Sequence, residues 1–498
     1  MNIDSKTRNK YKVTIGIECH VQLKTKSKLF SGADNDARTA APNTLVNHID
    51  FGLPGALPVL NKEAVRLASV LAFALNSKPQ SFSKFDRKHY FYPDLPMGYQ
   101  ITQYDQPIII GGDVEIHDGN NIKRIKITRA HLEADAGKSM HPAGKNYSLV
   151  DLNRAGTPLV EIVSEPDMHS SSEAKAFVRE LYLLVRYSGV SDANLYYGNM
   201  RFDVNVSVSR TEELGTRTET KNLNSFRSVE KAADYEINRQ IELLEKGEKV
   251  VQQTRGWDEA KQKTIAQRGK EEAHDYRYMP DPDLPPVILD AEYVKSIESK
   301  MPKMPAFWRK QLADLGIGSM HIETLLEAQA DYKDDGVEFL SLVCEDVNNK
   351  EYATSLANWF VNIEIPLRAQ INESGTDLEQ GLNRRDMYKQ LYGLISENKL
   401  SSTNAKILLT KLLTEGKPCR SVLKFATENS LIQLSDQNEI DKIVDEVIIN
   451  NPKPVSDIKK GEIKAVGYLV GQVMAHSSGQ ANPSLTRDLI LEKLGIDK

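Results

Sequence analysis

The hydrophobic period of the chain changes near residue 290, and this change limits the possible folds more than any other feature. Before it, short segments alternate polar and apolar residues, which is typical of β-strands. After about residue 295, apolar residues recur at helical spacing almost throughout. A proline-rich loop at 281–286 separates the two patterns. The sequence therefore predicts an α+β fold, in which a mixed or antiparallel sheet backed by helices precedes an all-helical part.

The length of 498 residues is too great for one ordinary core, so several domains are expected. We expect a sheet domain at 1–295, a helical domain at 296–420 and a small helical tail domain at 421–498. Within the helical part, Ser402 is a possible N-cap of a helix at 402–415. The segment Asn-Pro-Lys-Pro at 451–454 is interpreted as a short break, and two helices joined by 477–483 are expected to follow.

Charge and cysteine content exclude several classes of protein. The formal net charge is −5, so nucleic acid can be bound only through local patches and shape. The cysteines Cys19, Cys344 and Cys419 are far apart, which argues against a disulfide framework and a structural zinc site. The polar N-terminus and the lack of a long apolar run predict a cytoplasmic protein without a membrane span.

The segment 14–23 places Glu18 and His20 side by side on one face of a predicted strand. Apolar side chains and Cys19 take the opposite face by period-two alternation. An acid and an imidazole about 6.5–7 Å apart along a strand can hold a cation. A simply solvated polar face is the alternative for this segment alone.

Residues 131–138 bring Glu133, Asp135 and Lys138 to a turn marked by a glycine. Such a cluster can hold a hard cation together with an anionic substrate. Taken alone, the segment is better interpreted as a charged loop on the surface.

Residues 201–209 show the cleanest alternation in the chain. A phenylalanine and three valines take one face, and Arg201, Asp203, Asn205 and two serines take the other. Small polar side chains leave room for a ligand, so this face is expected to line a cleft.

Further predicted strands also carry polar side chains at every second position. These side chains are Asp151, Asn153, Glu161, Arg217, Glu219 and Lys221. If these strands neighbour one another in one sheet, their polar faces form one floor. A floor of this composition could bind Mg²⁺ or Mn²⁺ through oxygen ligands and leave basic groups for phosphate.

The segment 85–103 concentrates aromatic and charged residues around a glycine. It could stack a base or an adenosine, or contact a partner chain. An ordered loop held in place by its own tyrosines is the alternative that this segment alone favours.

Several long motifs resemble those of the B subunit of the bacterial aspartyl/glutamyl-tRNA amidotransferases. They occur in that family's order and cover most of residues 11–290, so a chance match would require many coincidences. The motifs are IGIECHVQLKTKSKLFSGA, FDRKHYFYPDLPMGYQITQ, HLEADAGKS, VDLNRAGTPLVEIVSEPD, MRFDVNVSV, TETKNLNSF and HDYRYMPDPDLPP. The helical part is also similar to the family's, through residues 467–474.

The resemblance implies an ATP-dependent ligase that forms a carbon–nitrogen bond with glutamine as amido donor. In that family, the B subunit uses ATP to phosphorylate the side-chain carboxylate of Glu-tRNA(Gln) or Asp-tRNA(Asn). Ammonia, released from glutamine by the A subunit, then displaces the phosphate, and the small C subunit tethers the other two. The implied cofactors are ATP and Mg²⁺. The implied partners are subunits A and C and the charged tRNA, with no membrane and no DNA.

The resemblance also implies a role for the predicted floor in that chemistry. Six residues become candidates for metal ligands, the last two at a second site: Glu18, His20, Glu133, Glu161, Asp203 and Glu219. Lys221 and Asn205 are the candidate catalytic residues, expected to face phosphate or the aminoacyl end. By the same resemblance, residues 1–295 form the family's cradle domain, and the helical domain and tail touch the tRNA body.

Two departures limit what the resemblance implies. Where family members often carry a cysteine pair, this chain has Val-Asn-His-Ile-Asp at 46–50, so zinc is not expected there. Residues 475–479 lack the two lysines of the family's Lys-x-Thr-Lys-Gly in the tail. Other basic residues are expected to meet the tRNA instead: Lys459, Lys460 and Lys464.

Two alternative functions remain at this point. A non-catalytic tRNA-binding scaffold would bind tRNA without ATP turnover, and it gives no reason for acids to share one floor. A metal-dependent hydrolase would release phosphate without charged tRNA or partner chains.

Overall fold

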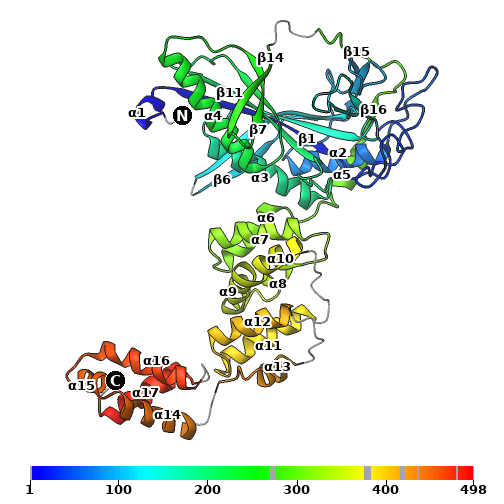
Figure 1. The fold of residues 1–498 in the computed structure, drawn as a ribbon. Helices are drawn as coiled ribbons and strands as arrows, with labels where there is room; N and C mark the ends of the chain where they lie inside the picture. Colours follow the sequence, from blue (N-terminus) through cyan, green and yellow to red (C-terminus); the bar gives the residue numbers. More distant parts are fainter. Residues whose placement is uncertain are drawn as a thin grey trace. The chain divides into compact units, whose positions relative to one another are not determined.

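The computed structural model describes residues 3–119, 121–269, 275–374, 383–414, 421–433, 437–477 and 481–496. The chain divides into two compact units, Met1–Pro305 and Ala306–Lys498, which are described separately below. A large sheet dominates the first unit, and the second unit is built of helices (Figure 1). The predicted α+β class is therefore confirmed. The boundary expected at 420, between helical domain and tail, stays a prediction.

Within the described residues, a nine-stranded sheet forms the centre of the first unit. Its order is β14-β13-β12-β11-β1-β10-β7-β5, with β6 paired to β7. β12 and β13 run parallel, whereas β1 pairs antiparallel with both of its neighbours, so the sheet is mixed. The bounds are β1 (Lys12–Gln22), β5 (Ile109–Ile110), β6 (Asp113–Asp118), β7 (Asn121–Ala134), β10 (Pro158–Ser164), β11 (Met200–Ser209), β12 (Thr218–Leu223), β13 (Gln253–Asp258) and β14 (Lys263–Gly269).

Three small sheets are separate from the nine-stranded sheet. Their strand orders are β15-β3-β4, β16-β2 and β8-β9. The bounds are β2 (Phe82–Ser83), β3 (Asp86–His89), β4 (Tyr99–Thr102), β8 (Lys138–Met140), β9 (Leu149–Asp151), β15 (Met279–Pro280) and β16 (Val287–Ile288).

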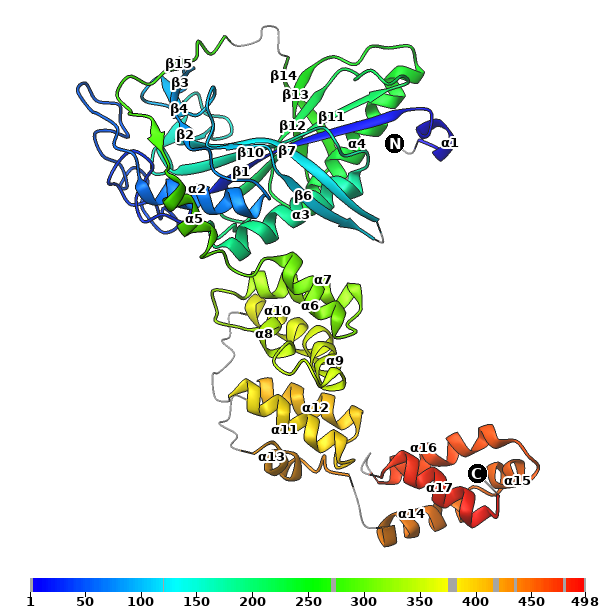
Figure 2. The same ribbon diagram turned by 180° about the vertical axis from the view of Figure 1, so that it is seen from behind.

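Helices α2 (Lys62–Ala74), α3 (Ser171–Ser188) and α4 (Phe226–Glu245) share one hydrophobic core with the sheet. α3 contacts β1 and β6, and α4 contacts β11 (Figure 1 and Figure 2). Along β1, Ile15, Ile17 and Cys19 belong to this core and are at most 1% exposed. Burial of one such side chain contributes about 1.5–3 kcal/mol, which fixes the face that β1 presents to the helices. The polar side chains of β1 therefore line the opposite face.

Serine residues are the N-caps of both long helices, α3 and α4, that pack against the sheet. The hydroxyl of Ser170 accepts a hydrogen bond of 3.1 Å from the backbone N–H of Glu173 at the start of α3. Ser225 and Ser228 form a reciprocal capping box at the start of α4. Each cap satisfies an N–H group that a helix leaves unpaired in its first turn. Two short helices complete the unit: α1 (Ser5–Arg8) and α5 (Ala291–Glu298).

The described residues of the second unit form helices almost throughout. The bounds are α6 (Pro305–Asp314), α7 (Ser319–Asp331), α8 (Phe339–Val343), α9 (Lys350–Trp359), the π-helix η1 (Phe360–Glu364), α10 (Ile365–Ser374), α11 (Arg384–Ser396), α12 (Ser402–Thr414), α13 (Val422–Glu428), α14 (Gln437–Asn450), α15 (Pro452–Lys459), the 3-10 helix η2 (Ile463–Ala465), α16 (Val466–His476) and α17 (Pro483–Leu494). Helices α14 to α17 share a hydrophobic cluster between Ile440 and Leu491. No described helix combines the length and the apolar character needed to cross a membrane.

Two local predictions in the helical unit were wrong. Ser402 is the first residue of α12 rather than its cap, because the hydroxyl of Ser401 accepts the N–H of Asn404 at 3.1 Å. The segment at 451–454 is the start of α15 rather than a break, because Pro452 stands in the first turn, where its fixed φ suits a helix. Residues 415 and 478–480, which fall in the predicted helix end and the predicted final loop, lie outside the described residues.

Candidate active site

The polar face of β1 joins the polar faces of four neighbouring strands. Glu18 lies opposite Asp203 of β11, and His20 lies opposite Glu161 of β10. β7 and β12 flank these strands and carry the remaining predicted acids, Glu133 and Glu219. The structure thus brings all six candidate metal ligands together on five adjacent strands, where they form two clusters.

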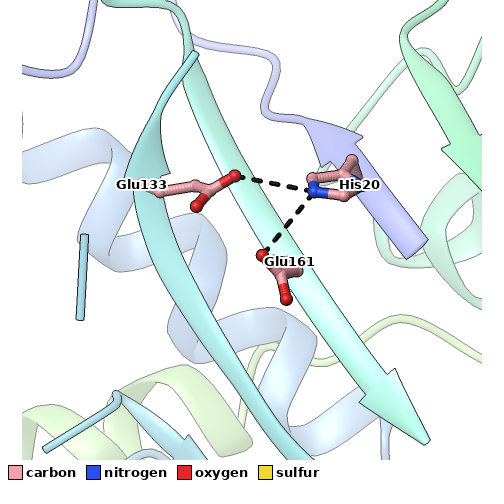
Figure 3. Close-up of side chains that lie close together, drawn as sticks. All are labelled: His20, Glu133 and Glu161. Atoms are coloured by element: carbon pink, nitrogen blue, oxygen red, sulfur yellow. Dashed lines mark ion pairs between the residues drawn. The ribbon is translucent and has the colours of Figure 1, made fainter. Parts of the chain in front are cut away.

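The first cluster consists of His20, Glu133 and Glu161. Their side chains point toward one another from β1, β7 and β10 (Figure 3). The Nε2 atom of His20 lies 3.7 Å from Oε1 of Glu133 and 3.6 Å from Oε2 of Glu161. None of the three side chains is more than 15% exposed. One imidazole and two carboxylates converging in a partly buried place are a suitable donor set for a divalent cation.

His131 also faces this cluster, and the sequence analysis did not include it among the candidates. Its Nε2 atom lies 3.7 Å from Oε2 of Glu133 and 3.6 Å from Oε2 of Glu161. The signal was present in the sequence, because His131 and Glu133 occupy every second position of β7, as Glu18 and His20 do in β1.

The Nδ1 atoms of His20 and His131 are buried, and neither has a hydrogen-bond partner among the described residues. In protein metal sites, the second ring nitrogen of a histidine usually donates to a carboxylate, a carbonyl or a water molecule. Among the described residues, no group fills that role for His20 or His131. The two rings thus have unused hydrogen-bonding capacity beside the cluster.

Charges in the first cluster stabilise one another. Burial opposes a charged imidazole, but Glu161 and Glu133 outweigh burial and raise the pKa of His20. Burial also opposes a charged Glu161, but His131 and His20 outweigh it and hold the pKa of that carboxyl well below its usual range. A cation bound between the carboxylates of Glu133 and Glu161 would neutralise their negative charge in place of a charged imidazole ring.

The second cluster consists of Glu18, Asp203 and Glu219, with Lys221 beside it. The Nζ atom of Lys221 lies 3.4 Å from Oδ2 of Asp203 and 3.3 Å from Oε1 of Glu219. The side-chain amide of Asn205 donates a hydrogen bond of 3.1 Å to Oε1 of Glu18, and its Oδ1 atom is buried without a described partner. Both candidate catalytic residues therefore contact the acids of this cluster.

A β-bulge in β12 orients Asp203. The register between β11 and β12 shifts between Phe202 and Val204, and Asn222 has a positive φ of 60°. Asparagine is one of the few residues other than glycine that adopts this conformation readily. The backbone N–H of Asn222 consequently donates a hydrogen bond of 2.8 Å to Oδ1 of Asp203, which leaves Oδ2 facing Lys221.

Negative charge is in excess around Glu18. Burial raises the pKa of the Glu18 carboxyl, and the nearby carboxylates of β10, β11 and β12 (Glu161, Asp203 and Glu219) raise it further. Lys221 lowers this pKa, but by less than the other groups raise it. Burial opposes a charged Lys221, but Asp203 and Glu219 outweigh it and raise the pKa of the ammonium group. One lysine therefore does not balance the acids of the second cluster, and a further cation would stabilise them.

Asp135 and Arg201 form a third charged group at the edge of the floor. Two guanidinium nitrogens of Arg201 lie 3.0 and 3.3 Å from the carboxylate of Asp135, and Arg154 lies 3.3 Å from the same carboxylate. Burial would raise the pKa of Asp135, but the two arginines outweigh it and lower that pKa. Asp135 is thus fully paired, unlike the acids of the second cluster.

Asp151 and Asn153, which the sequence analysis placed on the same floor, lie elsewhere. β9 pairs with β8 in a separate two-stranded sheet. The Oδ1 atom of Asp151 accepts the N–H of Asn43 at 3.1 Å, and Asn153 donates to the carbonyl of Ala41 at 2.7 Å. These two side chains hold the loop at 41–45, so their inclusion in the floor was wrong.

The aromatic segment 85–103 packs largely against tyrosines from a distant part of the chain. Directly after the segment, Tyr104 stacks on Tyr278 with ring centroids 3.9 Å apart and an angle of 10°. Tyr90 contacts Tyr276 at 6.2 Å, and the Nζ atom of Lys88 lies 4.8 Å above the Tyr276 ring. The segment contains strands β3 and β4, which pair antiparallel, so it is not one loop held by its own tyrosines. A role in stacking a base or contacting a partner chain stays a prediction. Lys88 also helps to lower the pKa of Glu161, so it places a positive charge near the first cluster.

One hollow adjoins the floor, and a second lies beside the end of β1. A smaller one of about 240 Å³ borders the second cluster and is lined by Gly16, Glu18, Asn205, Ser207, Leu214 and Arg217, among others. A larger one of about 610 Å³ lies where β1 ends and includes Gln22, Lys26, Lys138, Arg154, Tyr197 and Asn199 in its lining. Of these two hollows, the smaller one is the open space that borders the clusters of the floor.

Comparison with known proteins identifies the family. The model of the GatB/GatE catalytic domain matches residues 13–295, and the model of the GatB domain matches residues 341–494. Relatives named as the B subunit of aspartyl/glutamyl-tRNA(Asn/Gln) amidotransferase include that of Carboxydothermus hydrogenoformans, 41% identical over 97% of this chain and 99% of the relative. Those of Caldicellulosiruptor saccharolyticus and Coxiella burnetii are 42% and 44% identical, over 97% and 96% of this chain and 99% of each relative. The sequence resemblance is thus confirmed, and the chain belongs to the GatB/GatE family of amidotransferase subunits.

Proposed function

We propose that the chain is the B subunit of a heterotrimeric tRNA-dependent amidotransferase. It phosphorylates the side-chain carboxylate of Glu-tRNA(Gln) or Asp-tRNA(Asn) with ATP and then amidates it with ammonia. The observation that carries the proposal is the floor, where acids and imidazoles from five adjacent strands converge beside Lys221. Family membership over nearly the whole chain supports the assignment.

Activation by phosphate solves a chemical problem, because a carboxylate would have to expel oxide to accept ammonia. In the first step, a carboxylate oxygen bonds to the γ-phosphorus of ATP, and the bond from that phosphorus to ADP breaks. In the second step, the nitrogen of ammonia bonds to the acyl carbon, phosphate leaves with its electron pair, and a proton passes to solvent. Negative charge spreads over the phosphoryl oxygens during transfer, so positive groups stabilise the reaction.

Five of the six candidate ligands in the two clusters are carboxylates, and Mg²⁺ prefers carboxylate oxygens and retains some of its water. The potential ligand atoms of each cluster lie within 4.8 Å of one another. We assign one ion to His20, Glu133 and Glu161 and a second ion to Glu18, Asp203 and Glu219. Bound Mg²⁺ would supply positive charge to the phosphoryl oxygens.

Lys221 and Asn205 have distinct tasks in this scheme. The ammonium group of Lys221 contacts two acids and supplies a fixed positive charge to the phosphoryl group. Asn205 holds Glu18 through its amide N–H, and its free Oδ1 atom is an acceptor for a substrate N–H or O–H group.

The hollow of about 240 Å³ beside Glu18 suits the adenosine of ATP. Gly16 leaves space at its base, because the nearest atom to a Cβ there would be 3.8 Å away. Leu214 stands at the rim and is 68% exposed, which offers an apolar cover for a base. Arg217, also in the lining, has no ion-pair partner among the described residues and could meet a phosphate. With adenosine in this hollow, Glu18 and the rest of the second cluster would lie near the phosphates of ATP.

The proposed partners are subunits A and C and the charged tRNA, and the proposed location is the cytoplasm. In the tail at 421–498, Lys459, Lys460 and Lys464 are exposed and are proposed to contact the tRNA backbone. Ammonia would come from glutamine bound to the A subunit.

The test is amidation by the assembled complex, purified with co-expressed subunits A and C. We expect ATP turnover to depend strictly on Glu-tRNA(Gln) or Asp-tRNA(Asn), whereas a hydrolase would turn over ATP without them and a scaffold would not turn it over at all. We expect Glu133→Ala to abolish amidation even with free ammonia, while tRNA binding stays near normal. Glu115→Ala, which replaces a partly exposed acid of β6 away from both clusters, is the control. Full ammonia-dependent activity of Glu133→Ala would reject the assignment.

A further inference from the structure

Arg129 lies on β7 two residues before His131, and the reaction scheme gives it no task. Its side chain is partly buried, and its Nε atom is buried without a hydrogen-bond partner among the described residues. On the other side of the floor, Arg201 is by contrast paired with Asp135 at 3.0 Å. A guanidinium group keeps its charge and offers five N–H donors in a planar fork that fits a carboxylate or a phosphate. Arg129 thus has unused capacity to bind an oxyanion.

A β-bulge between β7 and β10 turns Arg129 toward the floor. The register shifts between Val163 and Ser164, where β7 has one extra residue. Ile127 and Ala130 are at most 2% exposed and belong to the core, so the two residues between them both face away from it. Bulges redirect side chains in this way and are frequent next to active sites. The local fold therefore presents Arg129 on the same face of the sheet as the acids of both clusters.

Aromatic rings hold the guanidinium group of Arg129 beside the first cluster. Its Cζ atom lies 5.7 Å from the centroid of the Tyr104 ring, which itself stacks on Tyr278. Burial raises the pKa of the Tyr278 phenol and Glu161 raises it further, whereas Arg129 lowers it, so this phenol lies near both charges. A cation held over a ring has fewer positions to sample, so less order is lost when it binds an anion.

Strand pairing places Arg129 in one row with the second cluster. Arg129 lies opposite Val163 of β10, and Val163 lies opposite Glu18 of β1. Glu18 in turn lies opposite Asp203 of β11. Residues directly opposite each other in an antiparallel pair point to the same face, and two strand spacings of about 4.8 Å separate Arg129 from Glu18. The short apolar side chain of Val163 leaves room for a ligand between the arginine and the acids.

The smaller hollow opens onto this place above Val163. Val163 and Glu18 both belong to its lining, and Arg129 lies one strand beyond Val163. With adenosine in the hollow, phosphates that extend past Glu18 would approach Arg129 from the side of the second cluster. The last phosphate of the chain would then lie between the acids and the guanidinium group.

We propose that Arg129 binds the γ-phosphoryl group of ATP and stabilises it during transfer to the substrate carboxylate. As a carboxylate oxygen bonds to the γ-phosphorus and the bond to ADP breaks, negative charge spreads over the peripheral phosphoryl oxygens, and the N–H groups of Arg129 donate to them. This assignment rests on the proposed function, which requires ATP at the floor. The substrate carboxylate could use the same donors, but the row through Val163 to the adenosine hollow favours the phosphate.

The test compares two nucleotides, the β,γ-imido analogue of ATP and ADP, each bound with Mg²⁺ to the assembled complex carrying subunits A and C. Arg129→Met removes the guanidinium group and keeps a side chain that can pack on Tyr104. We expect it to weaken binding of the analogue on the order of 10-fold, because charge-assisted hydrogen bonds are lost, and to leave the affinity for ADP unchanged. The kcat of ammonia-dependent amidation should fall on the order of 10³-fold, and the KM for charged tRNA should not change.

Two control variants sharpen the comparison. Arg129→Lys keeps the charge without the planar fork, so its affinity for the analogue should lie between those of the wild type and Arg129→Met. Arg124→Met removes an exposed arginine of the same strand, which pairs with Asp113 and Glu115, and it should have no effect on either nucleotide.

Two outcomes would overturn the proposal. They are an unchanged affinity of Arg129→Met for the analogue and an equal loss of affinity for the analogue and ADP. A raised KM for charged tRNA together with the first outcome would assign Arg129 to the substrate carboxylate instead. A wild-type complex that fails to bind the analogue or to amidate would reject the proposed function itself, whereas either outcome with an active wild type rejects only the role of Arg129.

Discussion

Replacement of Lys221 by methionine gives a decisive test of the second cluster. Lys221→Met keeps most of the side-chain volume but removes the ammonium group that contacts Asp203 and Glu219. Among the described residues, no other lysine or arginine forms an ion pair with the acids of this cluster. The pKa of Lys221 is raised, so the wild-type group stays charged throughout the pH range of an activity assay.

The magnitude follows from the two ion-pair distances. At an effective dielectric constant of about 20, charges 3.4 Å apart attract by about 5 kcal/mol. The Lys221 side chain is 39% exposed, so solvent reduces this value toward the ~1 kcal/mol of surface pairs. We take about 1.4 kcal/mol for the two contacts together, which corresponds to a tenfold change in an equilibrium constant.

Lys221→Met should therefore bind Mg²⁺ about tenfold more tightly, because the lysine no longer competes with the ion for the acids. Its kcat for ammonia-dependent amidation should nevertheless fall about 10²–10³-fold, since the group proposed to stabilise the phosphoryl charge is lost. Mg²⁺ titrations of binding and of amidation measure the two effects separately. Lys221→Arg keeps the charge and should retain the wild-type Mg²⁺ affinity. A kcat within about threefold of wild type, or a weaker Mg²⁺ affinity, would refute the reasoning.

Three further predictions concern other parts of the chain. Glu236→Ala should destabilise the first unit by about 3–5 kcal/mol in urea unfolding, because Arg239 and Arg255 lose the fully buried carboxylate that pairs with them at 2.7 and 2.9 Å. Burial opposes the charge of Glu236, but the arginines outweigh burial and lower the pKa of this carboxyl. The wild-type protein should therefore lose the free energy of unfolding that Glu236 contributes as the pH falls below about 4.5, and the variant should show a smaller loss. Gly16→Leu should fill the smaller hollow and raise the KM for ATP about tenfold without changing the KM for tRNA; an unchanged KM for ATP would exclude adenosine from that hollow. Replacement of Lys459, Lys460 and Lys464 by alanine should raise the KM for tRNA and reduce its salt dependence, and an unchanged salt dependence would argue against contacts with phosphate.

The strands of the floor could be predicted because side-chain alternation is a local property. Glu18, His20 and Asp203 each lie on the polar face of a strand whose other face is apolar, and this pattern is visible in the sequence. Alternation does not reveal which strands are neighbours, however. Asp151 and Asn153 belonged to an equally regular pattern, yet Asp151 lies in β9, which pairs outside the main sheet, and Asn153 lies just beyond that strand.

Features that depend on distant parts of the chain could not be predicted. The bulge at Asn222 is defined by the pairing of β12 with β11, and the pairing of Asp135 with Arg201 joins β11 to a loop 66 residues away. Single helix ends were also uncertain, because Ser401 and Ser402 are equally good caps by residue type. Only the packed structure decides between such neighbours.

The two clusters share one strand, since Glu18 and His20 belong to β1 and are separated by a single residue. Two residues of an extended strand span about 6.6 Å, which is longer than the roughly 3.5–4 Å between the metals of two-metal sites. The separation of the Cα atoms of Glu18 and His20 is set by covalent bonds in a central strand, so no movement of helices or loops can alter it. Side chains anchored in this way suit two different substrate groups held at a constant separation through successive reaction steps, and insertion of a single residue into β1 between them would turn one cluster toward the hydrophobic core.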